Sequence, residues 1–189
     1  MCEQADTNRH ISEFYHRLNR QGEFEKCRQF IQLVIKEYPN DRELTWLVGY
    51  LVAGPDELRN SELAVSIAQV AYEKSNDEQN SQYLGWALFR AERWEECLDV
   101  LSAKIDQKEK GEIDIAQSAV IAMSLWQLGR KEEAVSWLDA DYERRLADYI
   151  EKCREKVASK GGISFPTPAM LLMLDKEAKQ LMLESKLPN

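Results

Sequence analysis

Apolar residues recur at intervals of three or four along most of the chain, which is typical of amphipathic helices. Between residues 84 and 101 the pattern describes two such helices joined by a tight polar turn. The apolar positions of this hairpin are Leu84, Ala87, Leu88, Cys97, Leu98 and Leu101. A helix pair of this size cannot bury both of its apolar faces alone, so the pattern predicts neighbouring copies.

The sequence supplies such copies on both sides of this hairpin. A small residue stands at one place in the second helix of four successive hairpins: Cys27, Ala64, Cys97 and Ala134. The spacings between these residues are 37, 33 and 37 positions. Three similar spacings indicate an internal repeat of about 34 residues.

The same periodicity predicts an all-α protein. We expect helices over about 8–19, 23–38, 42–53, 61–74, 77–91, 94–107 and 113–128. Asn76 with Gln79 is predicted to cap the helix at 77. The segment 54–60 enlarges the turn of the second hairpin.

The C-terminal part departs from the repeat. An apolar stripe continues through Val135 to Val157 and predicts one helix of about 28 residues, weakest at 139–141. Thr167 and Pro168 open a last helix with a capping hydroxyl and a proline at its first position. The apolar face of that helix is too wide to leave in water, so we expect it to fold back as a cap.

The repeat resembles the tetratricopeptide repeat (TPR) family. The resemblance rests on small residues at the eighth place of a unit (Gly49, Gly85, Ala122), large apolar residues at the eleventh (Val52, Leu88, Leu125), the small residues above at the twentieth, and large apolar residues at the twenty-fourth (Leu101, Leu138). More narrowly, the chain is similar to TPR segments of multidomain bacterial signalling proteins. The resemblance implies a right-handed TPR helical-hairpin solenoid with a C-terminal capping helix pair. We expect a single domain, 1–189, with units at about 8–40, 41–76, 77–111 and 112–141 and an extension at 142–189.

The family places a ligand-binding groove on the first helices of its units. Carried over to this chain, the predicted groove consists of His16, Trp46, Tyr50, Gln79, Gln82, Trp86, Phe89, Arg90, Met123, Trp126 and Gln127. The family's clamp for peptide carboxylates is absent, because its late basic positions hold Ala116 and Val120. An aromatic and methionine floor suits an amphipathic helix or an apolar peptide. The alternative is that several of these residues belong to the core between helices.

These features predict a non-enzymatic scaffold that binds a protein or peptide in its groove. The alternative is a structural subunit of an oligomeric assembly, a homo-oligomer included, whose groove is occupied by its own C-terminal helix. A net charge of −8 argues against nucleic acid as the partner and favours a neutral to basic one. No run approaches the roughly 20 apolar residues of a membrane span, and residues 1–7 do not read as a signal peptide, so we expect a cytoplasmic protein without a membrane partner.

Candidate chemistry is sparse. His10 and His16 are six positions apart, which does not place two metal ligands on one helix face. The four cysteines form no Cys-x-x-Cys pair, and Cys27 and Cys97 are predicted to be buried as small hydrophobic residues. Gly161–Gly162 lacks the strand and lysine of a phosphate-binding loop. We therefore expect no catalytic residues, no metal and no cofactor.

Overall fold

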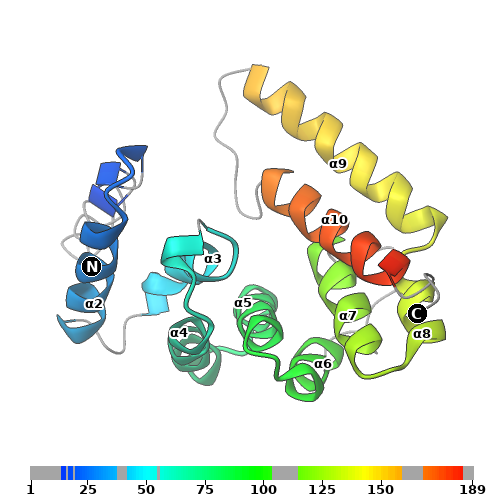
Figure 1. The fold of residues 1–189 in the computed structure, drawn as a ribbon, viewed down its shortest axis with the longest axis horizontal. Helices are drawn as coiled ribbons and strands as arrows, with labels where there is room; N and C mark the ends of the chain where they lie inside the picture. The colour runs from blue at the N-terminus through cyan, green and yellow to red at the C-terminus, as the bar shows by residue number, and fades with distance from the viewer. Residues whose placement is uncertain are drawn as a thin grey trace. The chain divides into compact units, whose positions relative to one another are not determined.

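The computed structural model describes residues 14–15, 17–18, 20–37, 42–54, 56–103, 115–158 and 168–184. These residues form helices and turns, and no strand occurs among them, so the all-α prediction is confirmed (Figure 1). The chain divides into two compact units, Met1–Ala87 and Leu88–Asn189, with the boundary inside one helix. The single domain over 1–189 stays a prediction.

The first unit is a series of short helical hairpins. Its elements are α2 (Phe24–Glu37), the 3₁₀ helix η1 (Arg42–Thr45), α3 (Trp46–Ala53), the 3₁₀ helix η2 (Asp56–Leu58), α4 (Ser61–Lys74) and most of α5 (Glu78–Arg90). The described residues before α2, at 14–15, 17–18 and 20, are also helical, and the rest of the helix predicted at 8–19 lies outside the described residues. Helix α3 and η1 pack on α4, and α2 contacts η2.

The second unit is built around one central helix. Its elements after α5 are α6 (Trp94–Ser102), α7 (Ile115–Gln127), α8 (Lys131–Trp137), α9 (Ala140–Ala158) and α10 (Pro168–Glu184). Helix α7 contacts α6, α8, α9 and α10. Ten consecutive residues of α7, 116–125, are buried, because neighbours cover this helix on every side. Helix α10 begins at Pro168, as the sequence predicts.

The same turn joins the helices of three predicted hairpins. In each, a leucine carbonyl at the end of the first helix accepts a hydrogen bond from the backbone N–H five residues later, and the residue just before that donor has a positive φ. The donor and acceptor pairs are Glu23 and Leu18 at 3.1 Å, Arg93 and Leu88 at 3.0 Å, and Arg130 and Leu125 at 2.9 Å. This is the Schellman arrangement, which satisfies carbonyls that a helix C-terminus would otherwise leave unpaired.

The four small residues of the repeat all lie in the core. Cys27, Ala64, Cys97 and Ala134 each have 0% of their surface exposed. A larger side chain has no room at such a position, since protein interiors are close-packed. The prediction that the two thiols are buried is confirmed.

The second hairpin has the enlarged turn that the sequence predicts. η2 lies between α3 and α4, and the Asn60 N–H donates to the Leu51 carbonyl at 3.1 Å. Gly54 follows α3 directly, and a Cβ atom there would lie 2.3 Å from the Tyr50 carbonyl oxygen. The chain therefore leaves α3 by a path that only glycine permits, and Asn60 then caps α4 by accepting from the Leu63 N–H at 3.0 Å.

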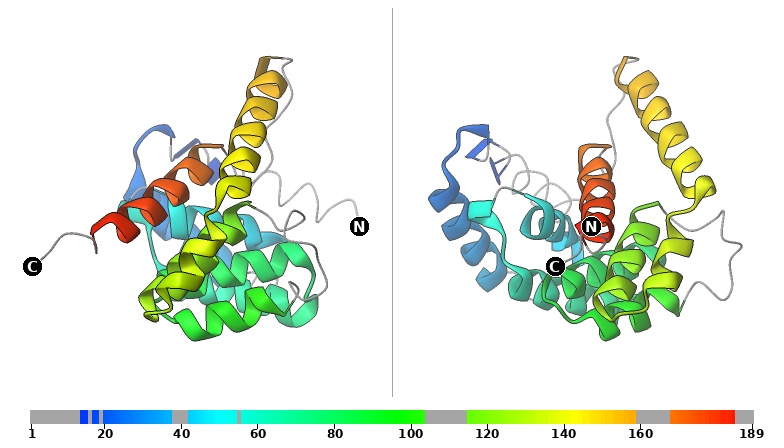
Figure 2. Two further views of the ribbon diagram at one scale, coloured as in Figure 1. Left: turned by 90° about the vertical axis from the view of Figure 1, so that its right-hand side faces the viewer. Right: turned by 45° about the vertical axis from the view of Figure 1, so that its right-hand side comes forward.

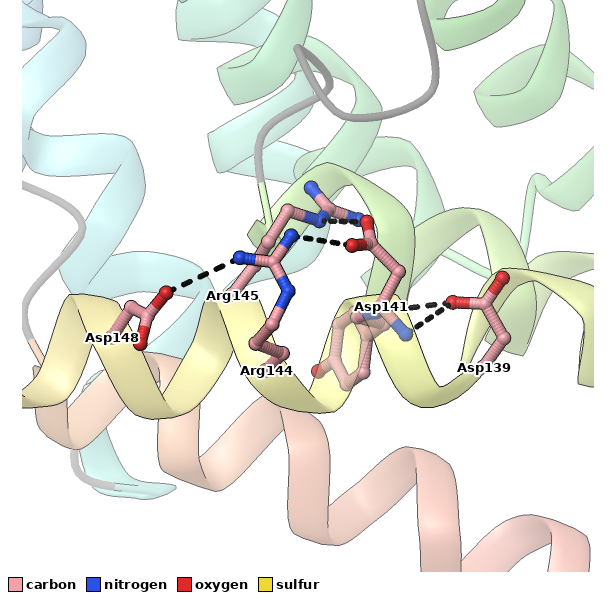
Figure 3. Close-up of polar contacts among 6 residues, drawn as sticks. Asp139, Asp141, Arg144, Arg145 and Asp148 are labelled. Atoms are coloured by element: carbon pink, nitrogen blue, oxygen red, sulfur yellow. Dashed lines mark hydrogen bonds and ion pairs between the residues drawn. The ribbon is translucent and has the colours of Figure 1, made fainter.

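The prediction of one long helix after 131 is wrong, because α8 ends at Trp137 and α9 begins at Ala140. The Asp139 carboxylate accepts hydrogen bonds from the backbone N–H groups of Asp141 at 3.1 Å and Tyr142 at 3.0 Å (Figure 3). An aspartate that bonds to the backbone ahead of it competes with helix continuation and starts a new helix. Arg144 and Arg145 then pair with Asp141 in the first turns of α9.

The predicted cap of α5 is wrong by one residue. Asn76 is exposed, and it is the Asp77 carboxylate that accepts from the Asn80 N–H, at 2.9 Å. The Asn80 side chain donates to the Ser75 carbonyl at 2.9 Å, and the Ser75 hydroxyl donates to Asp77 at 2.8 Å. These mutual bonds give Asp77 the capping role.

Candidate functional site

Two of the predicted groove residues of the first unit, Tyr50 and Trp86, belong to an aromatic cluster with Tyr15 and Tyr83. The ring centroids of Tyr50 and Tyr15 lie 4.9 Å apart, and those of Trp86 and Tyr83 lie 6.3 Å apart in an edge-on contact. Trp86 is 2% exposed, and burial raises the pKa of Tyr15, Tyr50 and Tyr83. The alternative that some predicted groove residues belong to the core between helices therefore applies to Trp86. Tyr50, in contrast, is half-buried.

The remaining predicted positions of this unit differ in exposure. Gln79 is exposed and Gln82 is half-buried. A hydrogen bond with Gln79 partly offsets the effect of burial on the pKa of Tyr83. His16 and the side chain of Trp46 lie outside the described residues. Tyr83 was missed by the sequence analysis, although it is three positions before Trp86 and thus on the same side of α5.

The predicted groove residues of the second unit lie on α5 and α7. Phe89 and Trp126 are half-buried, Gln127 is exposed, and Met123 is 1% exposed. The Lys131 ammonium lies 5.2 Å from the ring centroid of Trp126, within the range of a cation–π contact. The side chain of Met123 is therefore not accessible to a partner while its neighbours cover α7.

Arg90 is held by the C-terminal helix. Its guanidinium Nη2 lies 2.8 Å from Oε2 and 3.1 Å from Oε1 of Glu177 in α10. The side chains of Arg90 and Glu177 are 22% and 33% exposed, so this ion pair is partly shielded from water. Helix α10 contacts both α7 and α9, and Figures 1 and 2 show it lying beside α7. A residue predicted to bind a partner therefore binds a helix of its own chain.

A second set of polar contacts joins α10 to α9. The hydroxyl of fully buried Tyr142 donates to Asp175 Oδ1 at 3.4 Å, and Asp175 is 9% exposed. The Lys179 ammonium lies 3.0 Å from Asp175 and 2.8 Å from Glu143 of α9. Burial, followed by the charge of Asp175, raises the pKa of Tyr142 well above its usual range, so the phenol stays a donor. Burial alone would lower the pKa of Lys179, but its hydrogen bonds to Glu143 and Asp175 outweigh burial and raise it.

We call the surfaces of α7 and α9 that contact α10, together with Arg90, the α10-binding face. The sequence analysis predicted Arg90 in this region and missed Asp175 and Glu177. Asp175 carried a signal, because it interrupts the apolar stripe of the last helix. Nothing local pairs Arg90 with Glu177, which are 87 positions apart.

The thiols and the acidic residues offer little chemistry. Burial raises the pKa of the Cys97 thiol to about 12, partly offset by a hydrogen bond from Ser124 at 3.4 Å. Within the described ranges, no group of three or more His, Cys, Asp or Glu side chains is arranged to hold a metal ion. In the same part of the chain, no helix combines the length and apolar character needed to cross a bilayer.

Comparison of the chain with protein-family models, with curated proteins and with solved structures finds no match. The resemblance to TPR proteins therefore rests on the spacing of residues in the sequence, and it stays a prediction.

Proposed function

We propose that this chain is a non-enzymatic scaffold of the TPR type, a right-handed helical-hairpin solenoid that binds a protein or peptide. Two features of the described residues support the repeat: the Schellman turn that recurs after Leu18, Leu88 and Leu125, and the small residue buried five positions after each positive-φ residue. Repeated hairpins of this kind present an extended surface, which solenoid proteins use to bind partners.

One observation carries the binding role. Helix α10 lies outside the repeat, yet it packs on α7 and pairs with Arg90, a residue that the resemblance to TPR proteins assigns to the ligand groove. A surface that accommodates one amphipathic helix has the apolar area and the polar groups to accommodate another. The favoured ligand is accordingly an amphipathic helix or apolar peptide, neutral to basic overall because the chain carries a net charge of −8.

Site-specific photo-crosslinking tests this role. A photoreactive amino acid is placed in the full chain at Gln82 or Gln127, both predicted groove positions with exposed surface. Matched controls carry it at Glu62 of α4 and Glu132 of α8, exposed positions on second helices of hairpins. We expect one and the same protein to be crosslinked at 82 and 127 and not at 62 or 132. Equal crosslinking at all four positions, or none at any, would contradict the proposal.

A structural subunit is the second candidate. It is favoured by Leu172 and Leu183 of α10, which are 47% and 62% exposed. They are eleven positions apart, about three helical turns, and so lie on one side of α10. Light scattering on the full chain tests this candidate: a stable oligomer that Leu172→Glu converts to a monomer would support it over the scaffold.

A further inference from the structure

Helix α10 has the surface of a bound ligand helix. One side buries Leu171, Leu174 and Ala178 together with Asp175, and another side exposes Leu172, Lys176 and Leu183. Helix α7, in contrast, is buried over ten consecutive residues. The contacts of α10 are thus confined to one stripe, as expected of an amphipathic helix lying on a pre-formed surface.

Two acidic residues fix how α10 lies. Asp175 meets the Tyr142 hydroxyl of α9, and Glu177 meets the Arg90 guanidinium. Two positions along a helix correspond to about 200° of rotation, so these acids leave α10 on opposite flanks. A helix shifted by one residue would place an acid against apolar surface without its partner, which is costly. The α10-binding face therefore selects a helix with acids at these two places.

We propose, as an extension of the proposed function, that α10 is an intramolecular occupant of the partner site. The partner is then a helix of another protein with the pattern that α10 itself carries. In the eight residues Leu171–Ala178, that pattern is apolar at the first and fourth places, acidic at the fifth and seventh, and small at the eighth. Such a helix displaces α10 and takes over its contacts with Tyr142 and Arg90.

The polar contacts of α10 are weak enough for a helix of another protein to replace them. The pairs Arg90–Glu177 and Lys179–Glu143 are partly exposed, and ion pairs of this kind contribute little and weaken in salt. Only nine residues, 159–167, separate α9 from α10, so α10 competes at a high effective concentration. Weakening one contact of α10 should therefore raise the apparent affinity for a helix added in trans.

The probe is a fluorescent peptide of residues 168–184, titrated into the full chain and followed by anisotropy. In the Glu177→Arg variant, arginine faces Arg90 and repels α10, so we expect the peptide to bind at least about tenfold more tightly than to the wild type. Glu155→Arg, the same charge change at an exposed position of α9, should behave as the wild type. Glu177→Gln removes the ion pair more gently and should give an intermediate affinity, which keeps the test valid where the charge reversal perturbs folding.

A charge-swapped pair makes the test specific to Arg90. In Arg90→Glu, the chain's own Glu177 is repelled, and the site now carries a negative charge. A peptide with Glu177→Arg should bind this variant, while the wild-type peptide should not.

Three results would overturn the inference. One is equal affinity of the wild-type peptide for the wild type and for Glu177→Arg, since α10 would then not compete. Another is no binding to any variant. The third is a dimer of the wild-type chain without peptide that Glu177→Arg abolishes, which would identify α10 of a second copy as the occupant. None of these results bears on crosslinking at Gln82 in the other unit, so failure of the proposed function remains separately measurable.

Discussion

Glu92 occupies the same place in the α5–α6 turn that Gly129 occupies in the α7–α8 turn. Each precedes by one residue the donor of the Schellman hydrogen bond, and each has a positive φ, 59° for Glu92 and 78° for Gly129. Gly22 stands there in the first described hairpin, with a φ of 70°. A side chain in this conformation costs about 1–2 kcal/mol, so Glu92 is a local strain that the other two turns avoid.

Glu92→Gly should stabilise the protein. Relief of the backbone strain outweighs the greater freedom of glycine in the unfolded chain, and we expect a gain of up to about 1 kcal/mol in the free energy of unfolding. Urea denaturation measures it. Gly129→Ala is the matched reversal: nothing lies within 4 Å of the added Cβ, so strain alone should cost about 1 kcal/mol. A loss of stability in Glu92→Gly would contradict the strain argument.

Asp139→Ala should destabilise the second unit by about 0.5–2 kcal/mol, because it removes the cap that starts α9. The N–H groups of Asp141 and Tyr142 lose their acceptor. Asp139→Asn keeps a side-chain oxygen and should retain most of the stability. Thermal melting followed by circular dichroism compares the two variants with the wild type. A melting temperature of Asp139→Ala equal to that of the wild type would show that the cap contributes nothing.

Ala122→Leu tests the alignment of the repeat. Ala122 is fully buried on α7, and the repeat predicts that it faces α8 at a close helix crossing. Overpacking there should cost roughly 1–3 kcal/mol. Gly85→Leu changes the residue at the same place in the preceding helical hairpin of the repeat and should have the same effect. If urea denaturation gives both variants the stability of the wild type, the assigned alignment is incorrect.

We expect the free energy of unfolding to decrease as the pH rises above about 8, because the thiol of Cys97 is buried in the folded protein. The unfolded thiol loses its proton near its ordinary pKa of 9.0, whereas burial keeps the folded thiol protonated up to about pH 12. Between these values the unfolded state binds fewer protons, so the free energy of unfolding falls by up to about 1.4 kcal/mol per pH unit. Cys97→Ala should reduce this slope and still fold, since Ala64 and Ala134 fill the same place in other hairpins. Unchanged slopes in urea denaturation between pH 8 and 10 would exclude Cys97 as the source.

Removal of the residues after Lys160 should lower the melting temperature and promote association. It deletes Leu171 and Leu174, whose burial contributes about 1.5–3 kcal/mol each, and it uncovers the part of α7 that α10 contacts. Calorimetry and light scattering measure the two effects. A truncated chain that remains monomeric and equally stable would mean that α10 adds nothing to the second unit.

The amino-acid sequence by itself determined the helical class, the four buried small residues and the start of α10 at Pro168. These features are local or periodic: a small residue every 33 to 37 positions and a proline at a first helical position can be recognised without knowledge of distant contacts. The break at Asp139 was harder to predict, because the apolar stripe continues through it at helical spacing. Only the hydrogen bonds to Asp141 and Tyr142 decide between a continued helix and a new one.

The tertiary structure alone decided which predicted groove residues are exposed. Met123 and Trp86 carry the same apolar signal whether they line a groove or a core, and their burial depends on which segments cover them. One of the contacts of α10 joins Arg90 and Glu177, whose 87-residue separation leaves no trace in local pattern. An amphipathic stripe specifies that a helix must be covered, but the partner is chosen by the sum of contacts over the whole surface, which forms only when the chain has folded.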